Sequence, residues 1–240
     1  INANLLHGQY RRIASYFPNA DLAAQGMPSD AELKLLEPFR KDVPPKVFGT
    51  AWTPPPSGTP QATRANLRRA DALLKQAGGI VKKGQRANGK TGKPFTFEIL
   101  LGAPEDEKIA LAFIRDLKRL GITANARVLD SAAYIGRLNI YDFDMTLYYW
   151  LNSLSPGAEQ SLYWGCAAAK ENGRWNYAGI CNAAVDALSM SIAQTTSRDD
   201  LLATAHALDR VLMQGYYAIP LHYVGKDFVA HKTTVKRPAV

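Results

Sequence analysis

The sequence contains no run of about 18 apolar residues, the length that a membrane-spanning helix needs. Its first residues do not form a leader with a basic, then an apolar, then a small-residue region. The 240 residues are 47% hydrophobic, which is enough for a sizeable core in one large domain or two small ones. We therefore expect a globular chain rather than a membrane-spanning one.

Residues that commonly carry catalysis or metal binding are few and dispersed. The four histidines lie far apart, and the chain has no Gly-x-Ser-x-Gly turn and no dinucleotide-binding glycine motif. Asp142 and Asp144 lie on one face of a predicted strand, without a second acid to complete a glycosidase pair. We predict no catalytic residue, no metal site and no cofactor. An enzyme resembling the α/β hydrolases, with an unrecognised site, is the competing hypothesis.

Lysine and arginine outnumber aspartate and glutamate by 29 to 21, which gives a net charge of +8. Such a charge favours anionic partners through long-range attraction. The basic pairs are scattered along the chain, without an arginine-rich helix or an RNA-stacking motif. We expect a solvated basic surface and no nucleic-acid partner; a nucleic-acid binder would show affinity that falls steeply with salt. The pairs are Arg11–Arg12, Arg68–Arg69, Lys82–Lys83 and Lys236–Arg237.

The two cysteines, Cys166 and Cys181, flank a short segment. They could form a disulfide if their Cα atoms come within about 7 Å. That bond would need an oxidising compartment and would add about 3 kcal/mol of stability in the chain-entropy model. Free thiols are the second possibility. A metal site is the weakest, because no Cys-x-x-Cys spacing or nearby histidine supplies further ligands.

The middle of the chain alternates between strand and helix patterns. Residues 95–101 have strand composition, 105–120 have an acidic first turn and an apolar helix face, and 122–128 alternate between apolar and polar. A strand–helix–strand unit of this length predicts two parallel strands. A helix over 131–138 and a third strand over 142–150 follow.

Start and stop signals predict further elements on both sides of this unit. Ser29 and Glu32 form a capping box for a short helix that ends near Pro38. Six prolines between residues 44 and 60 exclude continuous helix there, and we expect little regular structure in residues 1–16. The other expected elements are a helix over 63–78, a hairpin bounded by turns at 82–84 and 88–92, helices capped by Asn182 and Ser197, and closing strands over 218–223 and 228–230.

The stretch from Asp142 to Cys181 combines many aromatic residues with a polar loop after Trp150. Ligands of open α/β sheets collect beyond the carboxyl ends of the strands, where this loop is predicted to lie. Aromatic rings with a few fixed polar groups suit a small organic ligand. An aromatic core seam beside a solvated loop is the alternative. The candidate ligand-binding residues are Tyr149, Trp150, Asn152, Ser153, Ser155, Glu159, Gln160 and Trp164.

Several segments, taken in order, resemble the C-terminal part of family 5 extracellular solute-binding proteins, the oligopeptide, dipeptide and nickel receptors of ABC importers. The Leu154–Gln160 loop and the Leu35–Arg40 segment are most similar to the Yej-type subgroup, which is associated with uptake of peptides and peptide antibiotics. The segments that carry the family resemblance are Phe143-Asp-Met145, the strand end at Trp150, Trp175-Asn-Tyr-Ala-Gly-Ile180 and Ala184-Val-Asp-Ala-Leu188.

The resemblance implies an α/β fold, the C-terminal lobe of a two-lobed periplasmic-binding-protein fold (type II, cluster C), with a mixed sheet and flanking helices. It also implies that the chain is a piece of a longer exported polypeptide. The expected function is to capture a peptide-like solute in the periplasm and deliver it to a membrane permease, as a monomer. An oligosaccharide or another non-peptide solute is the alternative ligand. We expect a lead-in segment over 1–62, a ligand-binding lobe over 63–225 and a C-terminal segment over 226–240.

The resemblance also bears on individual residues. In the family, a carboxylate three residues after the strand-end tryptophan commonly binds the amino terminus of the peptide, and here that position is Ser153. Either Glu159 supplies the anion instead, or Ser153, Asn152 and Gln160 bind a neutral group. Some receptors of the family carry a cysteine pair in the same loop, which favours the disulfide.

Overall fold

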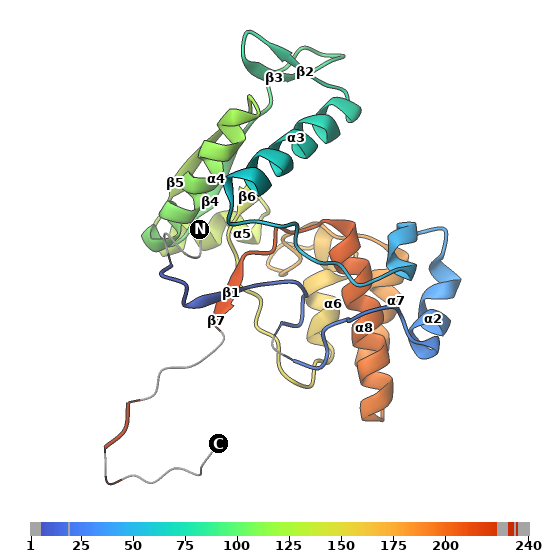
Figure 1. Ribbon diagram of the computed structural model, residues 1–240. Helices are drawn as coiled ribbons and strands as arrows, with labels where there is room; N and C mark the ends of the chain where they lie inside the picture. The colour runs from blue at the N-terminus through green and yellow to red at the C-terminus, as the bar shows by residue number, and fades with distance from the viewer. Residues whose placement is uncertain (1–5, 19, 225–229, 233, 235–240) are drawn as a thin grey trace.

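The computed structural model describes residues 6–18, 20–224, 230–232 and 234. These residues form two packed parts, each with its own hydrophobic core, joined by extended segments (Figure 1). One part contains a parallel sheet, and the other consists of helices. Among the described residues, none of the helices combines the length and hydrophobicity that crossing a bilayer requires.

The sheet part is built on β4 (Thr96–Leu101), β5 (Thr123–Val128) and β6 (Met145–Thr146), in the order β5-β4-β6 with parallel pairing throughout. The predicted parallel pair is thereby confirmed. Helix α4 (Glu107–Arg119) connects β4 to β5 and buries an apolar face against them, because its apolar residues recur at helical spacing. The other four strands form two separate antiparallel ribbons, β1–β7 and β2–β3.

The third strand is shorter than predicted, because only Met145 and Thr146 of the expected 142–150 strand pair with β4. The ring of Tyr134, from α5 (Ser131–Asn139), packs against Gly102 just after β4, in space where a Cβ would lie 2.5 Å from the ring. The Tyr134 hydroxyl donates to the carbonyl of Leu147 at 2.8 Å. The side chain of Tyr134 thus takes the place that further ladder bonds would need, and the chain leaves the sheet.

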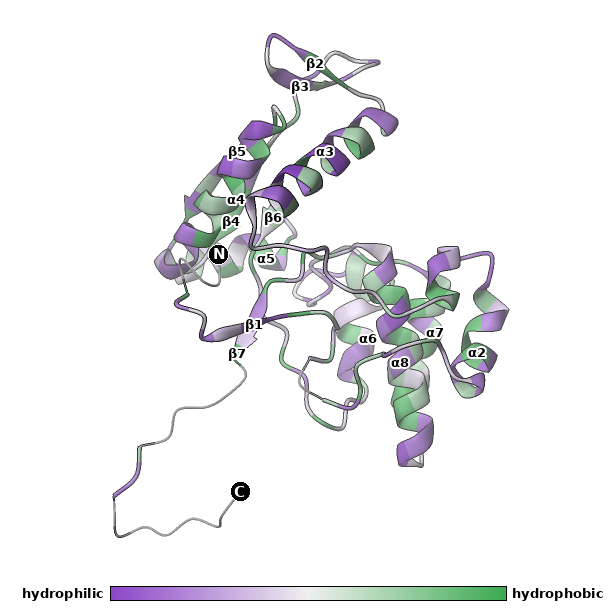
Figure 2. Cartoon of the chain, viewed as in Figure 1, coloured by the Kyte–Doolittle hydropathy of each residue, from purple (hydrophilic) through white to green (hydrophobic). Residues whose placement is uncertain are grey.

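The helical part packs α2 (Asp30–Leu36), α6 (Glu159–Trp164), α7 (Ala183–Ile192) and α8 (Arg198–Gly215) around one core. The three predicted caps are confirmed: the side chains of Ser29, Asn182 and Ser197 each accept a backbone N–H of the helix that follows. Figure 2 shows hydrophobic and hydrophilic residues mixed along α8, as expected for a helix with one buried side. Short 3-10 helices lie at Glu37–Phe39 (η1), Pro45–Phe48 (η2), Pro104–Asp106 (η3) and Ala168–Lys170 (η4).

Residues from the predicted lead-in segment contribute to this helical core. Phe17, Leu22, Leu36 and Val47 are buried in the same cluster as the apolar residues of α7 and α8. The strand β1 (Tyr10–Arg12) was not expected; it pairs antiparallel with β7 (His222–Val224), which lies within and just beyond the predicted 218–223 strand. Residues 228 and 229 of the last predicted strand lie outside the described residues, and the domain boundaries stay a prediction.

Helix α3 (Pro60–Gln76) lies beside the sheet part, with Leu74 packed against its core, and leads to the hairpin of β2 (Gly79–Lys82) and β3 (Gln85–Asn88), which lies beyond the sheet (Figure 1). The helix begins three residues earlier than predicted, because Thr59 caps it and Pro60 occupies its first position, where no N–H is needed. The predicted hairpin is confirmed. Lys83 and Gly84 both have positive φ at its turn, as tight antiparallel connections require.

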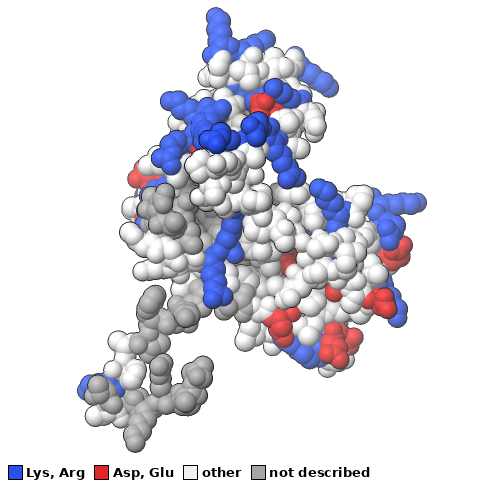
Figure 3. All heavy atoms as spheres, viewed as in Figure 1, with Lys and Arg blue, Asp and Glu red and all other residues white. Residues whose placement is uncertain are grey.

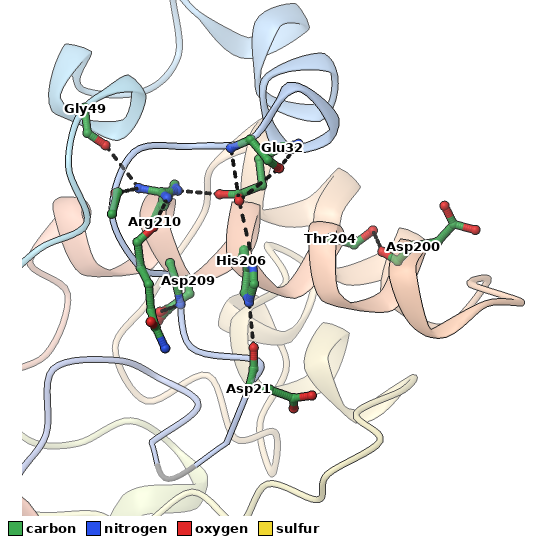
Figure 4. Close-up of polar contacts among 12 residues, drawn as sticks. Asp21, Glu32, Gly49, Asp200, Thr204, His206, Asp209 and Arg210 are labelled. Carbon is green, nitrogen blue, oxygen red and sulfur yellow. Dashed lines mark hydrogen bonds and ion pairs between the residues drawn. The ribbon is translucent and has the colours of Figure 1, made fainter.

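Two adjacent residues of α8 bind the early part of the chain (Figure 4). The Arg210 guanidinium, almost fully buried, donates to the Glu32 carboxylate at 2.5 Å and to the carbonyls of Gln25, Gly26 and Gly49 at 2.8–3.2 Å. Its neighbour Asp209 accepts the backbone N–H groups of residues 16 and 24 at 2.7 and 2.9 Å. These bonds fix residues 16–49 against a helix that lies some 180 residues later.

The Glu32 carboxylate is held in its charged form. Burial alone would raise its pKa, but hydrogen bonds from His206 and Arg210 lower the pKa to about 2. The same contact with Glu32 raises the pKa of His206, whose other ring nitrogen lies 2.7 Å from the carbonyl of Asp21. His206 is therefore a member of a partly buried charge network.

We expect Glu32→Gln to lower the free energy of unfolding at pH 7 by about 3–5 kcal/mol, because Arg210 would stay buried without a counter-charge. The folded-state pKa of Glu32 lies below its ordinary value of 4.5. Its contribution is therefore full above about pH 4.5 and is lost as the pH falls towards 2. Urea unfolding at pH 7 and at pH 3 measures both effects, and the variant should be less sensitive to acid than the parent.

The matched control is Glu37→Gln, which removes an exposed ion pair with Arg40. Exposed pairs contribute little, so its unfolding curve should follow that of the parent protein. Equal stability of the Glu32 and Glu37 variants would contradict the assigned role of the buried pair.

Candidate functional site

The carboxyl ends of β4 and β6 meet at one edge of the parallel sheet. The segments that follow them, residues 102–106 and 147–150, are joined by a hydrogen bond from the Tyr149 hydroxyl to the Asp106 carboxylate at 3.1 Å. Ligands of open α/β sheets bind at such an edge. The pair supplies a carboxylate and a phenol at one place, and the Tyr149 side chain is 59% exposed.

Partial burial and the neighbouring Asp106 raise the pKa of Tyr149 to about 12. The phenol is therefore a neutral hydrogen-bond donor at physiological pH. The β1–β7 ribbon adds His222 and Tyr10, whose rings meet edge-to-face at 4.6 Å. Burial lowers the pKa of His222 more than the charge of Asp106 raises it, so the imidazole is neutral as well. Asp106 supplies the one carboxylate among these four side chains.

A band of contacting aromatic rings continues from the sheet edge into the helical part. Tyr148 meets Tyr177 at 4.5 Å and Trp150 at 5.2 Å between ring centroids, and Trp150 meets Trp164 at 5.0 Å. The indole N–H of Trp150 donates to the carbonyl of Trp175, whose own side chain is 42% exposed. The band is a continuous apolar wall, and the exposed ring of Trp175 joins it through Tyr163.

Three of the predicted ligand-binding residues form an internal chain of hydrogen bonds. The Trp164 indole donates to Gln160 at 2.8 Å, Gln160 donates to Asn152 at 2.9 Å, and Asn152 donates to the carbonyl of Tyr16 at 3.0 Å. Gln160 is 0% exposed and Trp164 is 1% exposed. In this structure both side chains are hydrogen-bonded to other protein groups. They can therefore contribute to binding only by supporting the residues around them.

The other predicted residues lie in the loop before α6. The Glu159 carboxylate accepts the backbone N–H of Gly157 at 2.9 and 3.0 Å and also contacts Gln160. Ser153 and Ser155 are exposed, and the Ser153 hydroxyl accepts the N–H of Ser155 at 3.1 Å. Glu159 thus stabilises its own loop, whereas Ser153 and Ser155 face solvent.

Asp106, Tyr10 and His222 were absent from the predicted site. Asp106 could have been found, because it lies five residues after the end of a buried strand, in an acidic first helical turn. The rule that selected the Trp150 loop applies equally to that position. Tyr10 and His222 could not have been found from the sequence, because each lies on a strand of three residues. These two strands, β1 and β7, come from distant parts of the chain and meet only in the fold.

The disulfide between Cys166 and Cys181 is present, with Cα atoms 4.2 Å apart. It closes the segment that carries Trp175 and Tyr177. Asn176 lies buried inside that segment and bonds to Gly165 and Ile180, which gives the short loop an internal support. The bond and the asparagine together hold the aromatic wall in place.

The described residues include no cluster of three or more potential metal ligands. A separate hollow of about 390 Å³ lies beside the β1–β7 ribbon, with Arg12, Trp52 and Tyr223 in its lining.

Comparisons with known proteins agree on one family. A family model described as "Bacterial extracellular solute-binding proteins, family 5 Middle" matches residues 1–172. The chain is 40% identical over 99% of its length to the "Probable peptide-binding protein YejA" of Agrobacterium fabrum, and 35% identical over 99% to the "Peptidoglycan-binding protein YepA" of the same organism. It spans about two fifths of these relatives, 39% of the length of each.

A solved structure shares the fold. The oligopeptide-binding protein AppA from Bacillus subtilis, in complex with a nonapeptide, superposes with a TM-score of 0.69 at 19% identity, over 92% of this chain and 38% of that one. The expected α/β fold and the expected family, with its Yej-type relatives, are confirmed.

Replacing both cysteines by serine should lower the free energy of unfolding by about 3 kcal/mol, because the loop gains freedom in the unfolded chain. Urea unfolding with and without a reducing agent measures this. The reduced parent should match the double variant, and the variant should not respond to reductant. Unchanged stability of the parent after complete reduction would contradict a stabilising role for the bond.

Proposed function

The chain belongs to the bacterial extracellular solute-binding proteins, family 5, and on that premise we propose that it forms one lobe of a receptor for a peptide or peptide-like solute. The receptor captures its ligand in the periplasm and delivers it to the permease of an ABC importer. Membership of a solute-binding family agrees with the expectation that the chain is not an enzyme. The name of the Agrobacterium relative supports a peptide as the solute.

The observation that carries the proposal is the hydrogen-bonded Asp106–Tyr149 pair at the carboxyl edge of the sheet. A peptide presents an ammonium group at one end and alternating side chains along its length. Asp106 offers a charge-assisted bond to the ammonium, and such bonds are about twice as strong as neutral ones. The aromatic wall through Trp150 and Trp175 offers apolar contact for side chains without a strict shape requirement.

The proposed mechanism is hinged closure. A solute that contacts both lobes binds the closed form more tightly than the open form and shifts the population towards it. The β1–β7 ribbon is short and solvent-facing, and it brings Tyr10 and His222 beside the sheet edge. Closure would place such groups around the bound solute and exclude water from the Asp106 carboxylate, which strengthens its bond to a cation.

Asp106 and Glu159 are the two candidate anchors for the amino terminus of the peptide. The Glu159 carboxylate already accepts two bonds from one backbone N–H and contacts Gln160. Asp106 shares its carboxylate with a side-chain phenol that is itself exposed. Releasing Glu159 would disrupt its loop, whereas Asp106 needs no rearrangement of backbone bonds. We therefore assign the anchor to Asp106.

Thermal unfolding of the whole protein tests the substrate class. A ligand present at 100 times its dissociation constant should raise stability by about 2.7 kcal/mol. The panel comprises short peptides, peptidoglycan-derived peptides, oligosaccharides and nickel. A shift with the peptides supports the proposal; a shift only with oligosaccharides supports the alternative solute, and measurable turnover of any of them contradicts a pure receptor.

Asp106→Asn should weaken binding of a peptide with a free amino terminus by more than about 1 kcal/mol, because a charge-assisted bond becomes a neutral one. The affinity for the N-acetylated form of the same peptide should fall much less. Calorimetric titration of both peptides with the whole protein gives the difference.

Glu159→Gln is the matched comparison, since it also neutralises one carboxylate near the predicted site. If Glu159 is the anchor, its variant will show the selective loss for the free amino terminus and the Asp106 variant will not. If both variants bind both peptides as tightly as the parent protein does, neither carboxylate anchors the peptide.

A further inference from the structure

Although basic residues are scattered along the chain, its net positive charge is concentrated in one segment. Residues 60–93, which form α3 and the β2–β3 hairpin, contain nine lysines and arginines and one acid, Asp71. Their net charge equals that of the whole chain, so all other residues together are neutral. Figure 3 shows the basic side chains gathered over this extension, which we call the basic arm.

The charges of the basic arm are mostly unpaired. Asp71 pairs with Arg86 and Lys75, and this uses the one acid available. Elsewhere in the described part of the chain, most arginines have acidic partners, such as Arg198 with Asp21, and Arg11, Arg12 and Arg115 are the exceptions. Among the described residues, the other seven basic side chains of the arm have no ion-pair partner and all are exposed: Arg64, Arg68, Arg69, Lys82, Lys83, Lys90 and Lys93.

Apolar side chains lie among these cations. Helix α3 has no fully buried residue, and Leu73 on it is exposed. In the hairpin, Val81 is 51% exposed and Ile80 is partly exposed, directly before Lys82 and Lys83. Cations with exposed apolar residues beside them suit the interface of a bilayer, where the charges meet phosphates and the apolar groups enter the boundary of the acyl chains.

The arm lies at the edge of the sheet opposite to the candidate binding site. The backbone N–H of Arg86 in β3 donates to the carbonyl of Gly121, which precedes β5, and Phe95, which precedes β4, donates to the carbonyl of Arg86. The hairpin therefore contacts the amino ends of strands whose carboxyl ends carry Asp106. Six-residue strands separate the two edges by about 20 Å, so contact at one edge leaves the other free.

We propose that the basic arm binds the surface of a bilayer that contains anionic phospholipid. Nucleic acid or an acidic protein would also attract the cations, but neither gives a role to Ile80 and Val81 at the hairpin. The proposal goes beyond the receptor function and does not depend on the identity of the solute. A receptor that meets its permease at a membrane would gain from searching in two dimensions.

The test is sedimentation of the whole protein with vesicles of phosphatidylcholine alone or with about one third phosphatidylglycerol. Binding should require the anionic lipid and should disappear between about 0.05 and 0.5 M salt, where screening becomes short-ranged. Lys82→Glu with Lys83→Glu should weaken vesicle binding more than tenfold. The control with the same net charge is Lys34→Glu with Lys46→Glu, two exposed lysines outside the arm, which should bind like the parent.

A second variant separates lipid from other polyanions. Val81→Ser should weaken vesicle binding and leave retention on heparin unchanged, because only a bilayer offers an apolar boundary. Circular dichroism and the thermal midpoint confirm that each variant is folded. The proposal is overturned if vesicles do not bind while duplex DNA or polyglutamate does, or if the arm variants bind vesicles as the parent does. The latter outcome would mean that another part of the protein covers the arm.

Discussion

The ion pair between Arg210 and Glu32 is the contact on which the helical part depends. Taking a guanidinium and a carboxylate out of water is costly, and the cost is offset here because Arg210 also donates to three backbone carbonyls. Those carbonyls belong to a segment without long regular elements, which has few backbone bonds of its own. With Asp209 binding two N–H groups from the same region, α8 supplies the hydrogen bonds that the segment would otherwise lack.

That arrangement fixes the candidate binding site indirectly. Tyr16, whose N–H is bound by Asp209, accepts at its carbonyl from Asn152 and packs its ring against Trp164 at 5.0 Å. The aromatic wall therefore packs against the same early segment that α8 binds through hydrogen bonds. The disulfide then fixes the other side of the wall, around Trp175. Binding residues on loops need this kind of support, because a loop alone does not hold a side chain in one position.

Local signals in the sequence predicted most helices and the parallel strands, since caps such as Ser29 and Asn182 and the periodicity of 105–120 act over a few residues. The errors share a cause. The strand expected through Trp150 ends at Thr146 because the ring of Tyr134 intervenes, and the β1–β7 ribbon joins residues more than 200 positions apart. Both are tertiary effects that no window of sequence contains. The aromatic stretch was found by composition, but which of its members are buried depends on packing.

The distribution of charge also depends on which residues the fold brings together. The basic pairs are scattered along the chain, and the total charge of +8 indicated a solvated basic surface. The elements differ in net charge, and the whole excess of basic over acidic residues lies on the basic arm. Its field decays over about 8 Å at physiological salt, whereas the strands place Asp106 about 20 Å from the hairpin contacts. The carboxylate at the binding edge can therefore attract a peptide ammonium without repulsion from the arm, and the arm can meet a polyanionic surface without occupying the site. The separation thus keeps the proposed cation site at one edge of the sheet apart from the proposed anion-binding arm at the other.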